Sequence, residues 1–437
     1  MTASPAPAPD GGALRREVGA GGAVLLGLGS ILGTGVFVSL AIAAGVAGAW
    51  VLPAILLAGA VAALNGLSSA QLAAAYPVSG GTYEYGYRLL GPRLGFLAGW
   101  LFLAAKSASA ATAALGCAGY LLRLAGVDEP RAVVPLALAL AAAVTGVVLG
   151  GIRRSNRVNA VVVSLTLASL GALVLAAALR GGAGAVLPAG APGPELLEAA
   201  ALMFVAFTGY GRIATLGEEV REPRRTIPRA VVGALVACTL LYLAVGASAL
   251  VALGGAELGQ AARSSGGGAP LAAAARRLGV PGLDLALTLG AVTAMVGVIL
   301  NLVLGLSRVA LAMGRRADLP RGLARVSDAG SPTPAIVLVG AVICGLTLIG
   351  SVKTAWSFSA FTVLVYYGIT NLAALRLPAE LRLFPRWTAA LGLVGCLGLA
   401  PCVERPIWAA GGALIAVGLV WSEVARRMRR GEQAGSV

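Results

Sequence analysis

The sequence GLGSILGTGVF, residues Gly27–Phe37, interrupts the first long apolar stretch of the chain with four glycines, a serine and a threonine. Glycine is a weak helix former, and non-helical backbone inside a bilayer is stable only within protein or beside a water-filled cavity. The stretch therefore predicts a helix break next to a cavity. Close packing against another helix is the alternative, because Gly29 and Gly33 are spaced as in small-residue helix contacts.

The composition indicates an integral membrane protein. Of 437 residues, 58% are hydrophobic and 12% are charged, whereas soluble domains carry about 25% charged residues. The chain has no histidine, which excludes Ser-His-Asp triads and imidazole proton shuttles. Its five cysteines are scattered and form no CxxC pair, so we expect neither a metal nor a cofactor.

Long apolar runs divide the chain into spans of the length that a bilayer requires. The N-terminal residues 1–19 are polar and Pro/Ala-rich, which predicts a disordered segment, and they lack the features of a signal peptide. Residues 427–437 form a polar tail. The sequence predicts an all-α membrane protein with about twelve transmembrane helices, at roughly 20–46, 50–75, 94–122, 131–151, 158–180, 197–220, 229–254, 284–313, 334–350, 354–374, 387–403 and 407–426.

The positive charges predict an orientation. Most arginines, among them Arg153, Arg224, Arg315 and Arg430, fall in loops on the same side as the N-terminus. An excess of Lys and Arg marks the cytoplasmic side, so both termini should be cytoplasmic in a multi-pass protein of the plasma (inner) membrane. The net charge of +15 then reflects topology in a lipid bilayer, and no nucleic acid is expected as a partner.

A second interruption lies five helices after the first. The stretch FVAFTGYGRIATLGEEV, residues 204–220, carries Gly209 and Gly211 around Tyr210. Paired interruptions at corresponding positions of two halves are typical of secondary transporters built from inverted repeats. Half-helix ends at the midplane would offer free N–H groups and about half a positive charge to an anion such as a substrate carboxylate.

At these residues the chain resembles the amino acid–polyamine–organocation permease family. The matching motifs are GSILGTGVF (Gly29–Phe37), AAAYPVSGGTYEYGYRLLG (Ala73–Gly91), FTGYGRIATLGEEVREPRRTIPRA (Phe207–Ala230) and GLSRVALAMGRRADLP (Gly305–Pro320). The resemblance implies a five-plus-five inverted-repeat fold of the leucine-transporter type, with broken helices 1 and 6, that transports amino acids by alternating access. The repeats would be residues 20–180 and 197–374, with helices 11 and 12 within 387–426.

The resemblance also implies a substrate site at the two breaks. The substrate carboxylate would meet backbone groups around Ser30, Ile31, Gly33, Thr34 and Gly35, and the amino group would meet carbonyls near Phe207, Thr208, Gly209, Tyr210 and Gly211. Tyr210 and Phe207 are candidates for closing over the substrate, with ordinary helix packing as the alternative for Phe207. Many members have an acidic residue where this chain has Gly211, and Gln71 stands where a Glu is usual. These departures favour neutral substrates.

Lys106 is one of two lysines in the chain and lies near the middle of the third predicted span. Charged residues at this depth usually face a cavity and mark ion or substrate pathways, and Lys, unlike Arg, can be neutralised by desolvation. Some related transporters carry a coupling Lys in helix 5, where this chain has Thr166. Lys106 is therefore a candidate for proton coupling or for a fixed charge replacing Na⁺, with a structural ion pair as the alternative. Thr166 could ligate Na⁺, although such threonines more often bond their own helix.

Arg212, Glu218 and Glu219 lie at the predicted cytoplasmic mouth of helix 6. They could form an inner gate, or they could be a solvated helix end with weak surface ion pairs. An amino acid/polyamine exchanger, an exporter and a sodium-coupled symporter are the alternative transport functions. A channel would need a ring of charges or a filter loop, and an intramembrane enzyme would need a catalytic dyad or metal site, which the spans do not supply.

Overall fold

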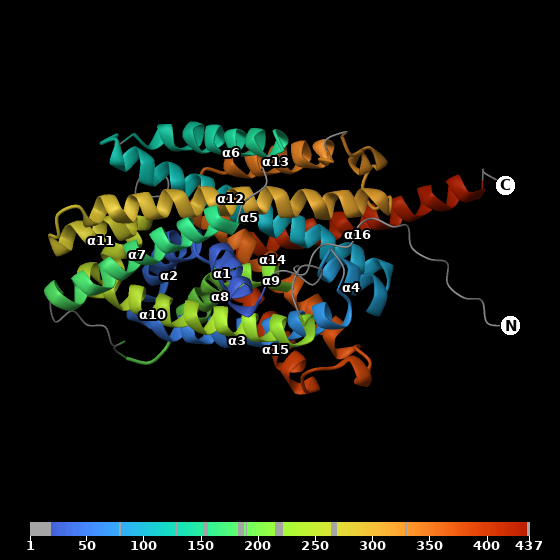
Figure 1. The fold of residues 1–437 in the computed structure, drawn as a ribbon, viewed down its shortest axis with the longest axis horizontal. Helices are drawn as coiled ribbons and strands as arrows, with labels where there is room; N and C mark the ends of the chain where they lie inside the picture. Colours follow the sequence, from blue (N-terminus) through green and yellow to red (C-terminus); the bar gives the residue numbers. More distant parts are fainter. Residues whose placement is uncertain are drawn as a thin grey trace.

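The computed structural model describes residues 19–77, 80–127, 129–151, 156–181, 188, 190–214, 222–263, 269–327 and 330–434, and this part of the chain is helical, with no strand (Figure 1). The helices are α1 (Ala20–Ile31), α2 (Leu40–Ala47), α3 (Val51–Ala75), α4 (Thr82–Leu89), α5 (Pro92–Leu124), α6 (Val133–Leu149), α7 (Asn156–Arg180), α8 (Glu195–Phe207), α9 (Gly211–Ala214), α10 (Pro223–Arg263), α11 (Pro270–Leu278), α12 (Leu283–Arg315), α13 (Thr333–Thr347), α14 (Val352–Leu375), α15 (Arg386–Leu399) and α16 (Arg405–Ala434).

Nine helical segments within these residues are long and apolar enough to cross a membrane, and three shorter apolar helices accompany them. One of the nine, Gly35–Ala75, holds parts of two predicted spans, because Gly48 turns the chain between α2 and α3 with a φ of +57°. The shorter helices, Gly21–Ile31, Thr333–Thr347 and Arg386–Cys402, also lie on predicted spans. The all-helical membrane architecture is confirmed, and the count of twelve stays a prediction.

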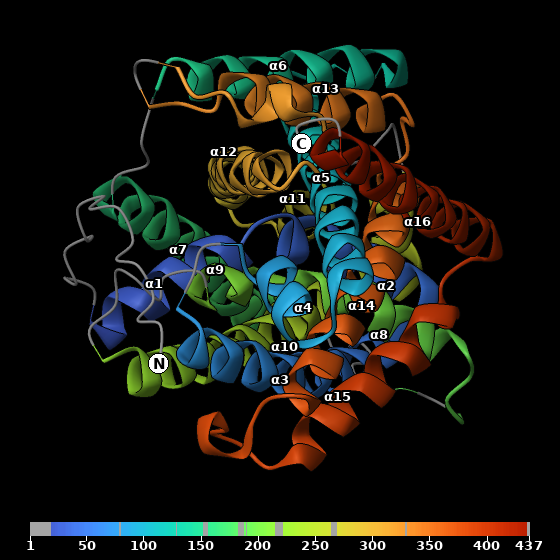
Figure 2. The same cartoon turned by 90° about the vertical axis from the view of Figure 1, so that its right-hand side faces the viewer.

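The long helices α5 and α12 pack against each other through the middle of the bundle (Figures 1 and 2). On one side of them α6 and α13 form a pair that contacts both helices, and on the other side α5 contacts α14 while α12 contacts α7. The interrupted segments around α1 and α8 lie among α3, α10 and α14. The fold therefore surrounds both interruptions with protein.

Ion pairs distinguish the two ends of the bundle. At the end that holds α4, Glu84 pairs with Arg316 after α12, and Arg93 at the start of α5 pairs with Glu423 in α16. At the opposite end, which holds α11 (Figure 1), Arg276 pairs with Asp284 at the start of α12. The division of the arginines predicted from the sequence likewise puts Arg93 and Arg316 on one side and Arg276 on the other.

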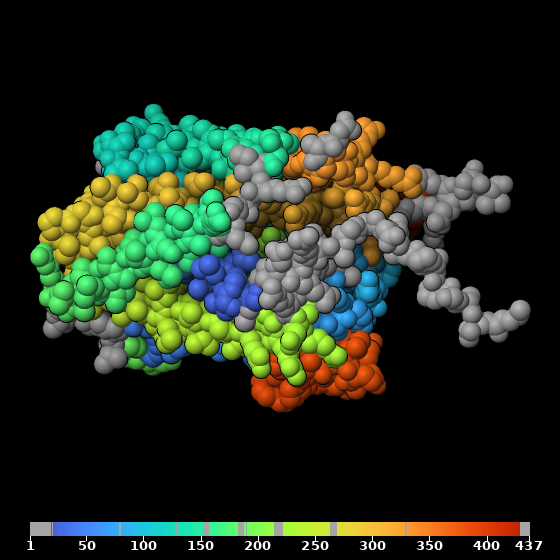
Figure 3. All heavy atoms as spheres, viewed as in Figure 1, coloured from blue at the N-terminus to red at the C-terminus, as the bar shows by residue number. Residues whose placement is uncertain are grey.

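The outer faces of the helices are apolar. Exposed valines and leucines run along α7 and α10, which contact each other and lie on the face seen in Figure 3. Leu179 of α7 is 75% exposed and Leu240 of α10 is 63% exposed. Such a surface is suited to hydrocarbon and not to water.

The segment between the seventh and eighth predicted spans differs from expectation. A flexible loop is predicted near residues 254–283 from its stretch RSSGGGAP, of which residues 264–268 lie outside the described residues. On either side of them, α10 continues to Arg263 and α11 begins at Pro270. Leu271 and Ala275 of α11 are fully buried. The apolar face of this amphipathic helix packs on α10 and α12, which a composition rich in Gly and Ser does not reveal.

Candidate functional site

The first interruption begins where α1 ends at Ile31. Leu32 has extended backbone, and after Gly33 and Thr34 the chain resumes as a π-helix, η1 (Gly35–Ser39), which leads into α2. Within the described part of the chain, no backbone carbonyl accepts from the amides of Gly33 and Thr34. The hydroxyl of Thr34 is also buried without a partner there. The break therefore presents unpaired polar groups at the middle of the bundle.

The second interruption begins where α8 ends at Phe207. A single 3-10 turn, η4 (Thr208–Tyr210), follows and leads into the short helix α9. The Thr208 hydroxyl donates to the carbonyl of Val205, 2.7 Å away, while the carbonyl of Thr208 accepts from the Tyr367 hydroxyl at 3.3 Å. Side chains thus satisfy part of the backbone that the break leaves unpaired.

The two interruptions touch each other. A Cβ at Gly209 would overlap the carbonyl oxygen of Ser30, so only glycine allows this approach. The Tyr242 hydroxyl of α10 lies 3.2 and 3.1 Å from the carbonyl oxygens of Ile31 and Ala206, so its one proton is shared between a carbonyl from each interruption. Helix breaks and close packing of small residues, the two alternatives for the glycine-rich sequence, occur together here.

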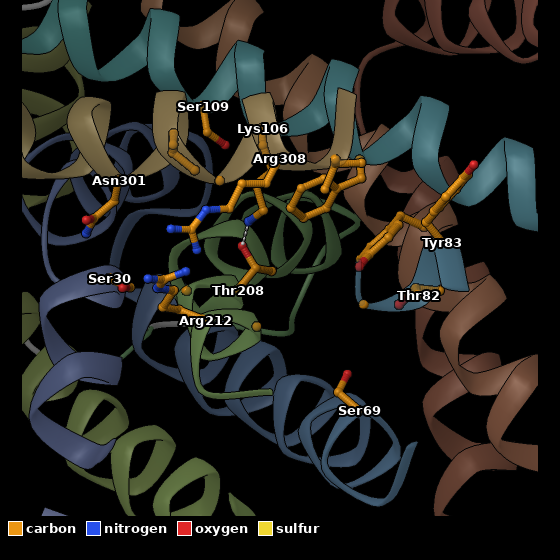
Figure 4. A pocket seen from close by; sticks show the side chains of 18 of the residues that line it. Ser30, Ser69, Thr82, Tyr83, Lys106, Ser109, Thr208, Arg212, Asn301 and Arg308 are labelled. Carbon is orange, nitrogen blue, oxygen red and sulfur yellow. Dashed lines mark hydrogen bonds between the residues drawn. The ribbon is translucent and has the colours of Figure 1, made fainter. Parts of the chain in front are cut away.

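A cavity of about 600 Å³ opens beside the paired breaks. Side chains from α1, η4, α5, α12 and α14 line it, and it extends past Thr82 and Tyr83 toward the end of the bundle that holds α4 (Figure 4). Arg315 and Arg316, at the α4 end of α12, lie in its wall. Among the described residues, no group of three Cys, Asp or Glu side chains could hold a metal ion.

Lys106 projects from α5 into this cavity with 7% of its surface exposed. Its Nζ donates to the Thr208 hydroxyl at 2.7 Å (Figure 4), and no carboxylate lies within ion-pair distance in the part of the chain that the structure describes. The alternative of a structural ion pair therefore has no partner among these residues. The amine instead connects α5 to the second interruption.

Most residues predicted for the site line the cavity, and some do not. Those in the wall are Ser30, Ile31, Thr34, Gly35, Lys106, Thr208, Gly209, Gly211 and Arg212. Gly33, Phe207, Tyr210 and Thr166 are not among the lining residues. Glu218 and Glu219 lie outside the described residues.

The two predicted aromatic closing residues are packed away from the cavity in this conformation. The Phe207 ring lies 5.1 Å from the Tyr242 ring, and the Tyr210 ring lies 5.5 Å from that of Tyr367, measured between centroids. Both side chains are fully buried. The Thr166 hydroxyl donates to the carbonyl of Val162 in its own helix, at 2.8 Å, as in the alternative to Na⁺ ligation.

Several lining residues were not predicted from the sequence. Trp356, Tyr366 and Tyr367 come from α14, and Asn301 and Arg308 come from α12. The Trp356 indole N–H donates to the carbonyl of Leu202 at 2.9 Å, which holds α14 to α8. Arg308 belongs to the motif GLSRVALAMGRRADLP, but the rotation of a helix that is apolar on all sides cannot be inferred from its sequence.

Comparisons with known proteins all find similarity to permeases and other transporters. The family model described as "Amino acid permease" matches residues 22–426. An uncharacterized transporter of Mycobacterium tuberculosis is 41% identical over 431 residues, 97% of this chain and 94% of its own. A branched-chain amino acid permease of Bacillus subtilis is 29% identical, covering 72% of this chain and 70% of its own. A vacuolar cationic amino acid transporter of Arabidopsis thaliana is 26% identical, covering 80% and 63%.

Proposed function

Because the chain belongs to the amino acid permease family, whose members are transporters and not enzymes, we propose that it moves amino acids across the plasma membrane by alternating access. The observation that carries this proposal is the meeting of two helix interruptions at one cavity. Amides at Gly33 and Thr34 that donate to no backbone carbonyl among the described residues suit a carboxylate, and carbonyls at the end of α8 suit an amino group. These two groups are what all amino acids share.

The contacts between helices support the proposed inverted repeat, residues 20–180 and 197–374. If the halves correspond, α5, α6 and α7 match α12, α13 and α14. The contact of α5 with α14 then corresponds to the contact of α12 with α7. The contact of α5 with α13 corresponds to the contact of α12 with α6. Likewise α3 contacts α8 as α10 contacts α1. Pairs related in this way are expected from two-fold symmetry.

The proposed state is inward-facing. The cavity extends toward the α4 end, where Arg315 and Arg316 lie, and excess positive charge favours the cytoplasm. Both termini would then be cytoplasmic. At the other end, Lys353 pairs with Glu198 and Glu404 and joins the starts of α14, α8 and α16, which supports closure on the outside. Arg212, Glu218 and Glu219 stay the candidate inner gate.

We assign the coupling role to Lys106. Its amine contacts the hydroxyl next to the second break, so a change in its charge would act directly on the half-helix that holds the substrate amino group. It would carry a proton or stand as a fixed charge in place of Na⁺. Sodium ligation by Thr166 has less support, because its hydroxyl is occupied by its own helix.

The wall of the cavity disfavours cationic substrates. Glu84 is its one carboxylate among the described residues, and Glu84 is paired with Arg316. The lack of acidic residues at Gly211 and Gln71, which favours neutral over cationic substrates, agrees with this wall. The same wall admits anionic amino acids.

The test is counterflow in proteoliposomes. Vesicles of purified protein are loaded with unlabelled amino acid, and the accumulation of the labelled amino acid is followed without an ion gradient. We expect saturable accumulation for at least one of the twenty amino acids. A channel gives no counterflow, and failure with all twenty on protein that unfolds cooperatively would overturn the proposal.

A further inference from the structure

The cavity wall carries an excess of positive charge close to the paired breaks. Figure 4 shows Lys106, Arg212 and Arg308 directed into the same part of the cavity, beside Thr208 and Ser30. They come from α5, α9 and α12, which meet only in the folded chain. In the part of the chain that the structure describes, neither Lys106 nor Arg308 has a carboxylate within ion-pair distance.

Among the described residues neither Lys106 nor Arg308 has an acidic partner, so an anionic group of a ligand would complement both side chains. Interaction between like charges is strong where the dielectric constant is low, and a cleft lined by one sign of charge concentrates ligands of the other sign. The amide of Thr34, which lines the cavity and donates to no backbone carbonyl among the described residues, already suits one carboxylate. A neutral amino acid brings a single carboxylate, balanced by its own ammonium group, and leaves the charge of the wall uncompensated.

We propose that the substrate carries a second acidic group, and that the transported class is acidic amino acids. This inference rests on the proposed function and replaces the preference for neutral substrates. The α-carboxylate meets the amides of the first break, and the side-chain carboxylate meets Arg308. A guanidinium matches a carboxylate with two parallel hydrogen bonds, and Arg308 lies more than a third exposed in the cavity wall, so its fork is accessible. Lys106 supplies the second positive charge next to Thr208.

Asn301 and Trp356 complete the wall around this charge. Asn301 lies two helical turns before Arg308 on α12 and is within the same cavity (Figure 4). The amide of Asn301 can donate to a carboxylate oxygen. The indole N–H of Trp356 is occupied by Leu202 and leaves an apolar ring surface for the methylene groups of the substrate.

The experiment compares substrates that differ only in charge. Counterflow of labelled glutamate and glutamine, and of aspartate and asparagine, is measured with the wild-type chain in proteoliposomes. We expect the acid to be preferred over its amide by about tenfold or more in kcat/KM, the usual effect of a charge-assisted hydrogen bond. Arginine should not compete at tenfold excess.

Two variants at Arg308 and one control variant test whether Arg308 causes the preference for acidic substrates. Arg308→Gln should reduce the ratio of glutamate to glutamine transport to about one, mainly through KM for glutamate, and Arg308→Lys should restore part of it. Arg325→Gln makes the same change at an exposed position outside the cavity wall and should leave the ratio unchanged. Thermal unfolding of each purified variant shows whether it is folded.

The outcomes separate this inference from the proposed function. Transport of glutamine or leucine with no preference for the acids overturns the acidic class and leaves an amino acid permease. An acid preference that Arg308→Gln does not alter, in a folded protein, overturns the role of Arg308. Absence of counterflow for every amino acid overturns the proposed function itself.

Discussion

The Nζ atom of Lys106 lies 2.7 Å from the Thr208 hydroxyl, and that hydroxyl donates its one proton to the carbonyl of Val205. Thr208 must therefore accept from Lys106. An amine can donate this bond in either protonation state, so the contact itself persists when Lys106 gains or loses a proton. What changes is the charge next to the second helix break, which is the property that coupling requires.

Replacing Lys106 tests this role. Lys106→Met should abolish uptake driven by a pH gradient, because the side chain can neither carry a proton nor supply a charge. Lys106→Arg keeps a charge that is not titratable. It should retain uptake without responding to the gradient if the wild-type proton is transported. Unchanged, pH-driven uptake by the Met variant in proteoliposomes would contradict the coupling role.

The contact between the two breaks predicts an intolerant position. A methyl group at Gly209 overlaps the Ser30 carbonyl, and overpacking costs about 1–3 kcal/mol in the free energy of unfolding. Gly209→Ala should lower the thermal unfolding midpoint and reduce counterflow. Gly171→Ala, in α7, meets no atom within 4 Å and serves as the control. Equal midpoints for the two variants would show that the breaks do not touch.

Removing the hydroxyl of Tyr242 should destabilise the contact between the two interruptions. Tyr242→Phe leaves the carbonyls of Ile31 and Ala206 without the donor that they share, and one net hydrogen bond contributes about 0.5–1.5 kcal/mol. Tyr85→Phe removes a buried hydroxyl that has no partner among the described residues, so it should be neutral or stabilising. Thermal unfolding of the two variants gives the comparison. A Tyr242→Phe chain as stable as Tyr85→Phe would refute the bridging role.

The sequence predicts the interruptions better than it predicts their surroundings. Glycines around Ser30 and Tyr210 are local signals, because glycine weakens a helix wherever it occurs. The contribution of Trp356 and Arg308 depends on how α14 and α12 are rotated, and helices that are apolar on every side carry little information about rotation. The packing of Phe207 against Tyr242 depends equally on contacts between segments distant in sequence.

At the α4 end, the ion pair between Glu84 and Arg316 predicts local stability. The Glu84 side chain is only 11% exposed, so its ion pair with Arg316 is little screened by water. Loss of the Glu84 charge would leave Arg316 with a weaker partner. We expect Glu84→Gln to lower the free energy of opening of α4 by about 1 kcal/mol. Amide hydrogen exchange in α4 would then be faster. The pair of Glu222 and Arg225 is more than 70% exposed on both sides. Glu222→Gln should change little. Unaltered exchange in α4 would indicate that the helix is held by other contacts.

The π-helical segment Gly35–Ser39 would allow α2, which follows the first interruption, to rotate about its own axis. A π turn contains one residue more than an α turn, and each residue of a helix accounts for about 100° of rotation. If the extra residue migrated along the backbone, α2 would roll about its own axis without tilting or unwinding. Such a roll would change which residues of α2 pack against α8 and α10 while the surrounding scaffold stayed still.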